Sequence, residues 1–111
     1  MVAVDLAWAA GIFEGEGCIY QYRGRGYQYP RLKVGMTDED IVRRFHEIVG
    51  CGSVTRFNSP AHEKRGNKPV WVWTAGRTED VARVAGMLWP WLGERRRAKA
   101  VEVLDAPRKV A

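Results

Sequence analysis

Two acidic residues, Glu14 and Glu16, stand close together near the start of this chain of 111 residues. Gly15 separates them and Gly17 follows, and the two glycines are expected to end the helix that leads into the pair. Carboxylate oxygens are ligands that hard divalent cations such as Mg²⁺ prefer. Taken alone, the pair indicates no more than polar residues at the end of a helix.

The second group of residues that can do chemistry is cationic. Arg95, Arg96 and Arg97 are consecutive, and Lys99 follows Arg95 at the spacing of one helical turn. The chain as a whole carries a formal net charge of +5 and has an isoelectric point of about 9.6. This balance favours a polyanionic partner, most often nucleic acid, although charge also keeps a protein in solution.

Cysteine and histidine usage gives no sign of a zinc site. Cys18, Cys51, His46 and His62 lie apart, without zinc-site spacing, and both thiols are expected to be reduced and structural. Asp5 interrupts a short apolar run at the N-terminus, and no apolar stretch reaches the length of a membrane span. We therefore expect a cytoplasmic protein with no membrane partner. Its Ala-, Arg-, Gly- and Val-rich composition fits a bacterial or phage-infected cell.

Hydrophobic periodicity predicts the elements that must position these groups. Helices are expected at residues 4–14, 38–49, 78–89 and 92–105, and strands at residues 18–23, 27–36, 53–58 and 69–75. Residues 1–106 then form a single domain with a polar loop at 59–68, and residues 107–111 form a frayed tail. The order predicts an α+β fold, αββαββα, with helices on one face of a four-stranded, mostly antiparallel sheet and the other face open.

The expected first helix is apolar on nearly all sides, which indicates burial on more than one side. Ala7, Ala10 and Gly11 are small enough to let another backbone come close. The sequence therefore predicts that this helix packs on its own core and also on a second helix.

Residues 9–17 (AAGIFEGEG) resemble the nine-residue LAGLIDADG motif, because the small residues, apolar positions and paired acids fall in register. The segment departs from the motif where Ala9 replaces the usual Leu and where both acids are Glu. Residues 50–54 (GCGSV) resemble this family's turn into its third strand. Residues 89–92 (WPWL), with the basic run that follows, resemble its late turn and basic helix. Nearly the whole chain is thus similar to a single-motif LAGLIDADG homing endonuclease.

The resemblance implies a site-specific endonuclease that hydrolyses phosphodiester bonds of double-stranded DNA with Mg²⁺ or Mn²⁺. It implies that Glu16 binds the metal, helped by the backbone carbonyl of Gly15, and that Arg95 stabilises charge on the scissile phosphate. The consecutive arginines leave open which of them does so. Glu14 is expected to be structural more than metal-binding. The family often positions water with a polar residue after the second strand, and the only one here is Thr37, which puts that role in doubt.

One motif per chain implies a homodimer, and a two-fold dimer implies a palindromic or nearly palindromic target. The first helix is expected to pair with its counterpart in the second copy. The interface is expected to contain Leu6, Ala7, Ala10, Gly11 and Glu14. The resemblance also implies that the gene belongs to a mobile genetic element such as an intron.

Alternation along the strands places tyrosines and basic residues on the open sheet face, a combination suited to a β-ribbon in a major groove. The expected DNA-binding residues are Tyr20, Tyr22, Tyr29, Arg31 and Lys33 on this face, Arg23 and Arg25 at the hairpin end, Arg56, whose face in the third strand is ambiguous, and Lys99 in the last helix. An ordinary solvated face is the alternative. Trp71 and Trp73 share one face of the fourth strand, where burial under the helices is favoured over stacking on bases.

A catalytically inactive relative is the competing functional interpretation. Proteins that resemble this family also act as maturase-like splicing factors or transcription regulators, which bind RNA or DNA without cutting it. An acid at Glu16 favours the nuclease, because a binding protein has no need of a metal ligand there.

Overall fold

The structure is a computed structural model that describes residues 2–57, 66 and 68–110. Its elements are α1 (Ala3–Glu16), β1 (Gly17–Gly24), β2 (Tyr27–Met36), α2 (Glu39–Val49), β3 (Ser53–Phe57), β4 (Val70–Ala75), α4 (Thr78–Leu88), the 3₁₀ helix η1 (Trp89–Trp91) and α5 (Glu94–Asp105). Residue 58 of the predicted third strand and most of the predicted loop at 59–68 lie outside the described residues. The other predicted helices and strands are confirmed to within two residues at each end.

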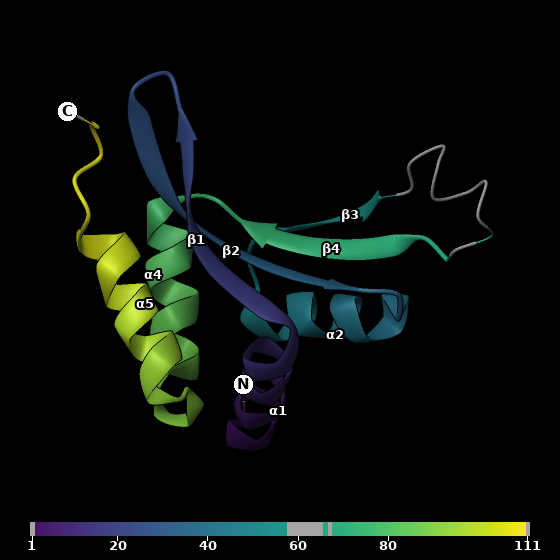
Figure 1. Ribbon diagram of the computed structural model, residues 1–111. Coiled ribbons are helices and arrows are strands. Elements are labelled where there is room, and N and C mark those ends of the chain that lie inside the picture. The colour runs from purple at the N-terminus through teal and green to yellow at the C-terminus, as the bar shows by residue number, and fades with distance from the viewer. Residues whose placement is uncertain (1, 58–65, 67, 111) are drawn as a thin grey trace.

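The four strands form one antiparallel sheet in the order β1-β2-β4-β3. Figure 1 shows the helices on one side of this sheet, while the other side is open and the long β1–β2 hairpin extends past the helices. The predicted α+β fold with one covered and one open sheet face is therefore confirmed. None of the described helices combines the length and hydropathy that a bilayer crossing requires.

Strand alternation decides which side chains meet the helices. Leu32 and Val34 of β2 are 1% and 0% exposed, and Val34 lies opposite the fully buried Trp73 of β4. Trp73 meets the ring of Phe45 edge-on, with 4.8 Å between centroids, and donates from Nε1 to the carbonyl of Cys51 at 2.8 Å. The predicted burial of Trp73 is confirmed, and its one polar atom has a partner, as a buried indole requires.

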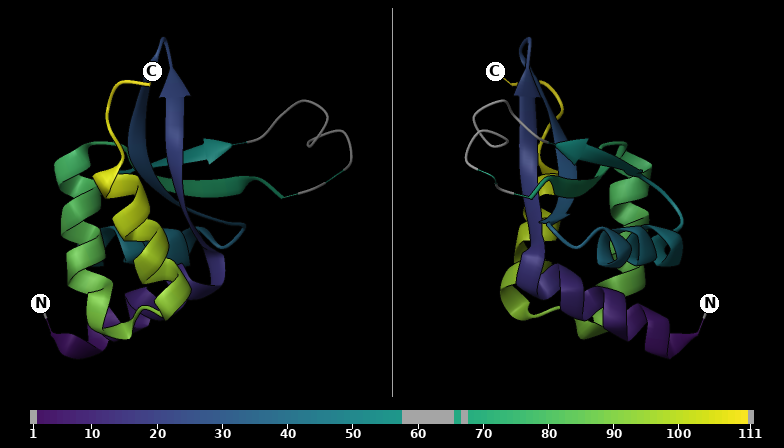
Figure 2. Two further views of the ribbon diagram at one scale, coloured as in Figure 1. Left: turned by 60° about the vertical axis from the view of Figure 1, so that its left-hand side comes forward. Right: turned by 90° about the vertical axis from the view of Figure 1, so that its right-hand side faces the viewer.

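The C-terminal tail is not frayed, and that prediction is corrected. The N–H of Gln28 donates to the carbonyl of Arg108 at 2.8 Å, and the N–H of Val110 donates to the carbonyl of Gly26 at 2.8 Å. Both views of Figure 2 show the tail running beside the β1–β2 hairpin. The tail therefore adds backbone hydrogen bonds along the part of β2 that β4 does not reach.

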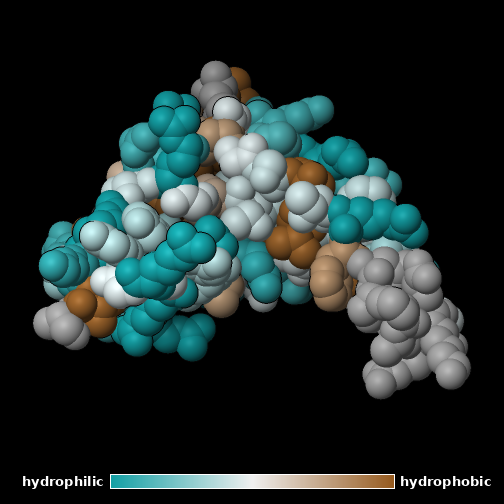
Figure 3. All heavy atoms as spheres, turned by 90° about the horizontal axis from the view of Figure 1, so that it is seen from above, coloured by the Kyte–Doolittle hydropathy of each residue, from teal (hydrophilic) through white to brown (hydrophobic). Residues whose placement is uncertain are grey.

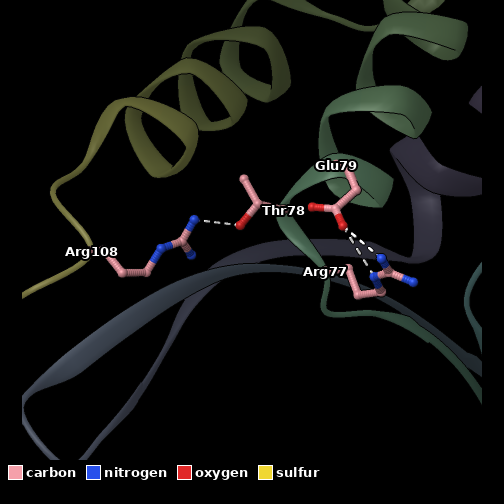
Figure 4. Close-up of polar contacts among 4 residues, drawn as sticks. All are labelled: Arg77, Thr78, Glu79 and Arg108. Atoms are coloured by element: carbon pink, nitrogen blue, oxygen red, sulfur yellow. Dashed lines mark hydrogen bonds and ion pairs between the residues drawn. The ribbon is translucent and has the colours of Figure 1, made fainter.

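A side-chain contact anchors the tail to the start of α4. Figure 4 shows Arg108 donating to the hydroxyl of Thr78, beside the ion pair of Arg77 with Glu79. Hydrogen bonds from its own backbone N–H and from Arg77 hold the pKa of Glu79 below its usual value. A negative charge is favourable at this position, because it lies in the first turn of a helix.

Gly50 and Gly52 provide a test of the packing around Trp73. Both have positive φ, 76° and 82°, and a Cβ at Gly50 would meet nothing within 4 Å, whereas one at Gly52 would lie 2.6 Å from Nε1 of Trp73. We expect Gly52→Ala to lower the free energy of unfolding by about 3 kcal/mol, because a clash adds to backbone strain. Gly50→Ala should cost about 1 kcal/mol from strain alone. Urea unfolding measures both, and equal losses would contradict this packing.

Candidate functional site

Glu16 is the last residue of α1, and its side chain is exposed. It forms no hydrogen bond or ion pair with any part of the chain that the structure describes. It borders a hollow on the open sheet face that Lys33 and Gly35 of β2 also line, together with residues of β3 and β4. Glu16 is thus a carboxylate that remains available to a ligand from outside the chain.

The oxygen atoms at this end of α1 suit a hard divalent cation. The last carbonyls of a helix lack intrahelical partners, and Gly15 lies in that last turn. The negative end of the helix dipole also favours positive charge here. Glu16 and the Gly15 carbonyl therefore fit Mg²⁺ or Mn²⁺ by ligand type. Within residues 2–57, 66 and 68–110, no three acidic, histidine or cysteine side chains gather as a metal site.

Glu14, two residues earlier in the chain, has a different environment. Its carboxylate accepts the backbone N–H of Gly93 at 2.6 Å, and its backbone carbonyl accepts Nη2 of Arg96 at 3.0 Å. Nε of Arg96 also lies 3.9 Å from the carboxylate. These contacts join the end of α1 to the start of α5. Glu14 is therefore engaged within its own chain, and its expected place in a dimer interface stays a prediction.

The three consecutive arginines of α5 have separate environments. Arg97 donates from Nε to the carbonyl of Trp89 at 3.0 Å and from Nη2 to that of Pro90 at 3.3 Å. Arg96 is occupied by α1, as described above. Arg95 is exposed and has no polar partner among the described residues. Of the three arginines, Arg95 is therefore the one whose guanidinium is available to an external phosphate.

The β1–β2 hairpin brings most of the expected DNA-binding residues onto the open face, because directly opposed residues on two strands point the same way. The opposed pairs on this face are Cys18–Lys33, Tyr20–Arg31 and Tyr22–Tyr29. The guanidinium of Arg31 lies over the ring of Tyr22 at 4.0 Å, and Arg25 is exposed in the hairpin turn. Cys18 is also exposed, so the expectation of a structural thiol is wrong for this cysteine.

Arg56, whose face the sequence left ambiguous, lies on the other side of the sheet, apart from the expected DNA-binding residues of the open face. The register opposes Arg56 to Trp71, which packs against the core under the helices. The guanidinium of Arg43 in α2 lies 5.2 Å from the ring of Trp71 on that side. The predicted burial of Trp71 is confirmed only in part, since its side chain is partly exposed.

Arg23 and Lys99 lie at the edge between β1 and α5. Arg23 is opposed to the buried Gln28, and both line a hollow that Lys99 also borders. The ammonium of Lys99 forms an exposed ion pair with Glu102 at 2.6 Å. Tyr20 of the hairpin cluster lines the same hollow, so these two cations lie beside that cluster, at the edge of the open face.

The sequence reasoning missed four residues of the open face, which are Thr55, Phe57, Val70 and Val72. Figure 3 looks onto this face and shows hydrophobic residues gathered between hydrophilic ones. A signal was present in the sequence: once Trp71 and Trp73 are assigned to the core, alternation places the two valines on the opposite face.

The exposed side of α1 differs from the expected dimer interface. Ala10 is 0% exposed within its own chain, and Leu6 packs partly against the same core, so the expectation for Ala10 is corrected. Gly11 is exposed, and a Cβ built there would meet nothing within 4 Å. Val4, at 73% exposure, and the partly exposed Ala7 continue the same side of the helix. This stripe of small and apolar residues is what a second helix can reach.

Solved structures of homing endonucleases share this fold. The homing endonuclease I-CvuI, in complex with its target, matches with a TM-score of 0.73 and 24% identity over 91% of this chain and 64% of that one. The archaeal intron-encoded I-Vdi141I, complexed with DNA, matches with a TM-score of 0.70 and 10% identity over 92% and 67%. The LAGLIDADG homing endonuclease I-GzeII, in complex with its DNA target, matches with a TM-score of 0.68 and 20% identity over 90% and 34%.

The chain thus spans less than two thirds of the length of I-CvuI. No protein-family model and no curated protein sequence matches it. The structural likeness covers 91% and 90% of this chain for I-CvuI and I-GzeII, and it shows that this chain has the fold of the LAGLIDADG homing endonucleases.

Glu14 and Glu16 offer a matched test of their separate roles. We expect Glu14→Ala to lower the free energy of unfolding by about 1–3 kcal/mol, because it leaves the N–H of Gly93 without its acceptor and removes the carboxylate that pairs with Arg96. Glu16→Ala removes an exposed side chain without partners and should change it by less than about 0.5 kcal/mol. Urea unfolding at one protein concentration measures both. A loss from Glu16→Ala as large as that from Glu14→Ala would contradict the assignment.

Proposed function

We propose that two copies of this chain form a site-specific, metal-dependent endonuclease that hydrolyses double-stranded DNA. The observation that carries the proposal is the exposed carboxylate of Glu16, which has no polar partner among the described residues and borders a hollow of the open face that Lys33 also lines. The similar structures of homing endonucleases, several of them in complex with DNA, support the same substrate. I-Vdi141I is intron-encoded, and this supports a gene of this protein within a mobile genetic element such as an intron. The proposed place of action is the cytoplasm.

The described residues divide the chemistry among them. Glu16 and the Gly15 carbonyl would hold the cation, and Mg²⁺ or Mn²⁺, when bound, would supply Lewis acidity for phosphodiester hydrolysis. Arg95 donates to the phosphate oxygens, where negative charge grows during hydrolysis. Lys33 and Arg31 hold the duplex against the open face through its backbone and base edges. Each residue acts on DNA that the open face has already oriented.

A second copy completes the site in this proposal. One chain contributes a single carboxylate at the end of α1, and a hard divalent cation would be held better by carboxylates from two copies. The exposed stripe with Gly11 and Ala7 lets the α1 helices of two copies pack closely, which brings the two Glu16 residues together. A two-fold axis between them requires a palindromic or nearly palindromic target.

Cleavage assays test the role of the acid directly. Purified protein is incubated with a plasmid library that carries randomised inserts, and cut ends are sequenced. We expect linear products with Mg²⁺ and none with EDTA. Glu16→Gln should abolish cutting of the identified target, and Arg95→Ala should slow it by about 10²-fold, because one stabilising donor is lost.

Exposed residues elsewhere provide the controls for this assay. Glu47→Gln in α2 and Arg83→Ala in α4 make the same chemical changes on the surface of other helices and should leave the cleavage rate unchanged. Sequence-specific binding without cutting in any divalent metal would replace the nuclease with a DNA-binding relative. Cutting by Glu16→Gln at the unchanged rate would overturn the role of Glu16.

The dimer has its own matched pair of variants. Gly11 in α1 and Gly86 in α4 are both exposed, and a Cβ at either would meet nothing within 4 Å. We expect Gly11→Leu to raise the dimer dissociation constant at least tenfold, because its side chain would hold the two α1 backbones apart. Gly86→Leu should leave the dimer intact. Analytical ultracentrifugation measures both, and equal sedimentation of the two variants would rule out pairing through this side of α1.

A further inference from the structure

The open face has two chemically different halves. The β1–β2 half carries the tyrosines and cations described above. The half formed by β3 and β4 carries what we call the apolar patch, which consists of Thr55, Phe57, Val70 and Val72. Phe57 is 59% exposed, and no described residue of β3 or β4 on this face is charged. Large apolar side chains in a row on a solvated face indicate a binding surface.

Gly35 of β2 keeps the patch uncovered. A Cβ at this position would lie 3.7 Å from Cγ1 of Val70 and 3.7 Å from Cγ2 of Val72, so any longer side chain would lie across both valines. Gly35 does not have a positive φ, and its backbone conformation is therefore open to other residues. The absence of a side chain at Gly35 therefore leaves the surface of Val70 and Val72 open to a ligand.

The surroundings of the patch favour DNA as its occupant. Lys33 lines the same hollow together with Glu16, the proposed metal ligand, and Arg31 follows on the same face of β2. A duplex that lies along this cationic strand must continue over the neighbouring β4 and β3, because the strand order is β1-β2-β4-β3. The charge of the face thus suits a polyanion, while the apolar patch needs an apolar group on that polyanion.

We propose that the apolar patch reads the C5-methyl groups of thymines in the major groove of the target. This inference rests on the proposed function, since it requires sequence-specific binding of DNA. The thymine methyl is the apolar group that base edges display in the major groove, and threonine methyl groups and phenylalanine rings are among its usual contacts. The β1–β2 half then reads polar base edges, and the β4–β3 half selects A·T pairs by their methyl groups.

Replacing thymine with uracil tests the inference, because uracil lacks only the methyl group. A target duplex is first selected from a randomised pool by binding in Ca²⁺. Its dissociation constant is then measured with deoxyuridine in place of thymidine, one position at a time. We expect two symmetry-related positions or groups of positions at which the change weakens binding about fourfold for each methyl lost.

Two variants show whether the patch is the reader. Val72→Ser removes both methyl groups of the side chain, and Phe57→Ser removes the exposed ring. In both variants the penalty for uracil should shrink or vanish at the sensitive positions. Lys33→Ala, the control, should weaken binding to the thymine and uracil duplexes by the same factor and so leave the penalty unchanged.

The outcomes separate this inference from the proposed function. Specific binding with equal affinity for thymine and uracil duplexes overturns the inference and leaves the proposed function standing. A selected target that has no thymine at any position sensitive to the variants also overturns the inference and leaves the proposed function standing. A changed oligomeric state in Phe57→Ser, with the uracil penalty intact, assigns the patch to contact between protein chains. Failure to select any duplex overturns both.

Discussion

The hydrogen bond between the carboxylate of Glu14 and the N–H of Gly93 is the contact on which the site depends. Glu14 lies two residues before Glu16, and Gly93 lies two residues before Arg95. A single bond of 2.6 Å therefore fixes the relative position of the two segments that carry the proposed chemistry. It also gives a partner to a backbone N–H at the start of α5, where a helix has none of its own.

The two glutamates show how environment divides identical side chains. Glu14 meets a backbone N–H and the guanidinium of Arg96 within its own chain, so its charge is compensated. Glu16 has no such partner among the described residues and keeps its lone pairs for a cation. The two side chains are chemically identical. Because residues at the start of α5 bond to Glu14 and form no hydrogen bond or ion pair with Glu16, Glu14 positions the two helices and Glu16 remains available as a ligand. The same holds for Arg95 and Arg96.

The features that could be predicted are those that follow from local sequence patterns. The order of helices and strands follows from periodicity, and alternation outward from Ile19 places Tyr20 and its strand partner on the open face as expected. Ala10 could not be placed, because a helix that is apolar on nearly all sides gives no phase for its buried face. Arg56 lies in a strand without clear alternation, and its face follows only from pairing with Trp71.

The C-terminal segment illustrates the contacts that local patterns miss. Its residues show no periodicity, and the bonds from Gln28 to Arg108 and from Val110 to Gly26 join parts of the chain that are far apart in sequence. These hydrogen bonds can form only after the hairpin has folded, because the hairpin supplies the backbone partners of the tail.

This pairing has a consequence for the solubility of the protein. Beyond the end of β4, the outer edge of β2 would present unpaired N–H and carbonyl groups next to exposed tyrosines, which is a template for strand addition by another molecule. The segment from Arg108 to Val110 occupies that edge with the chain's own backbone. A protein shortened before Arg108 would carry an open edge beside its hairpin and would be prone to aggregate during expression, even with every residue of the proposed site present.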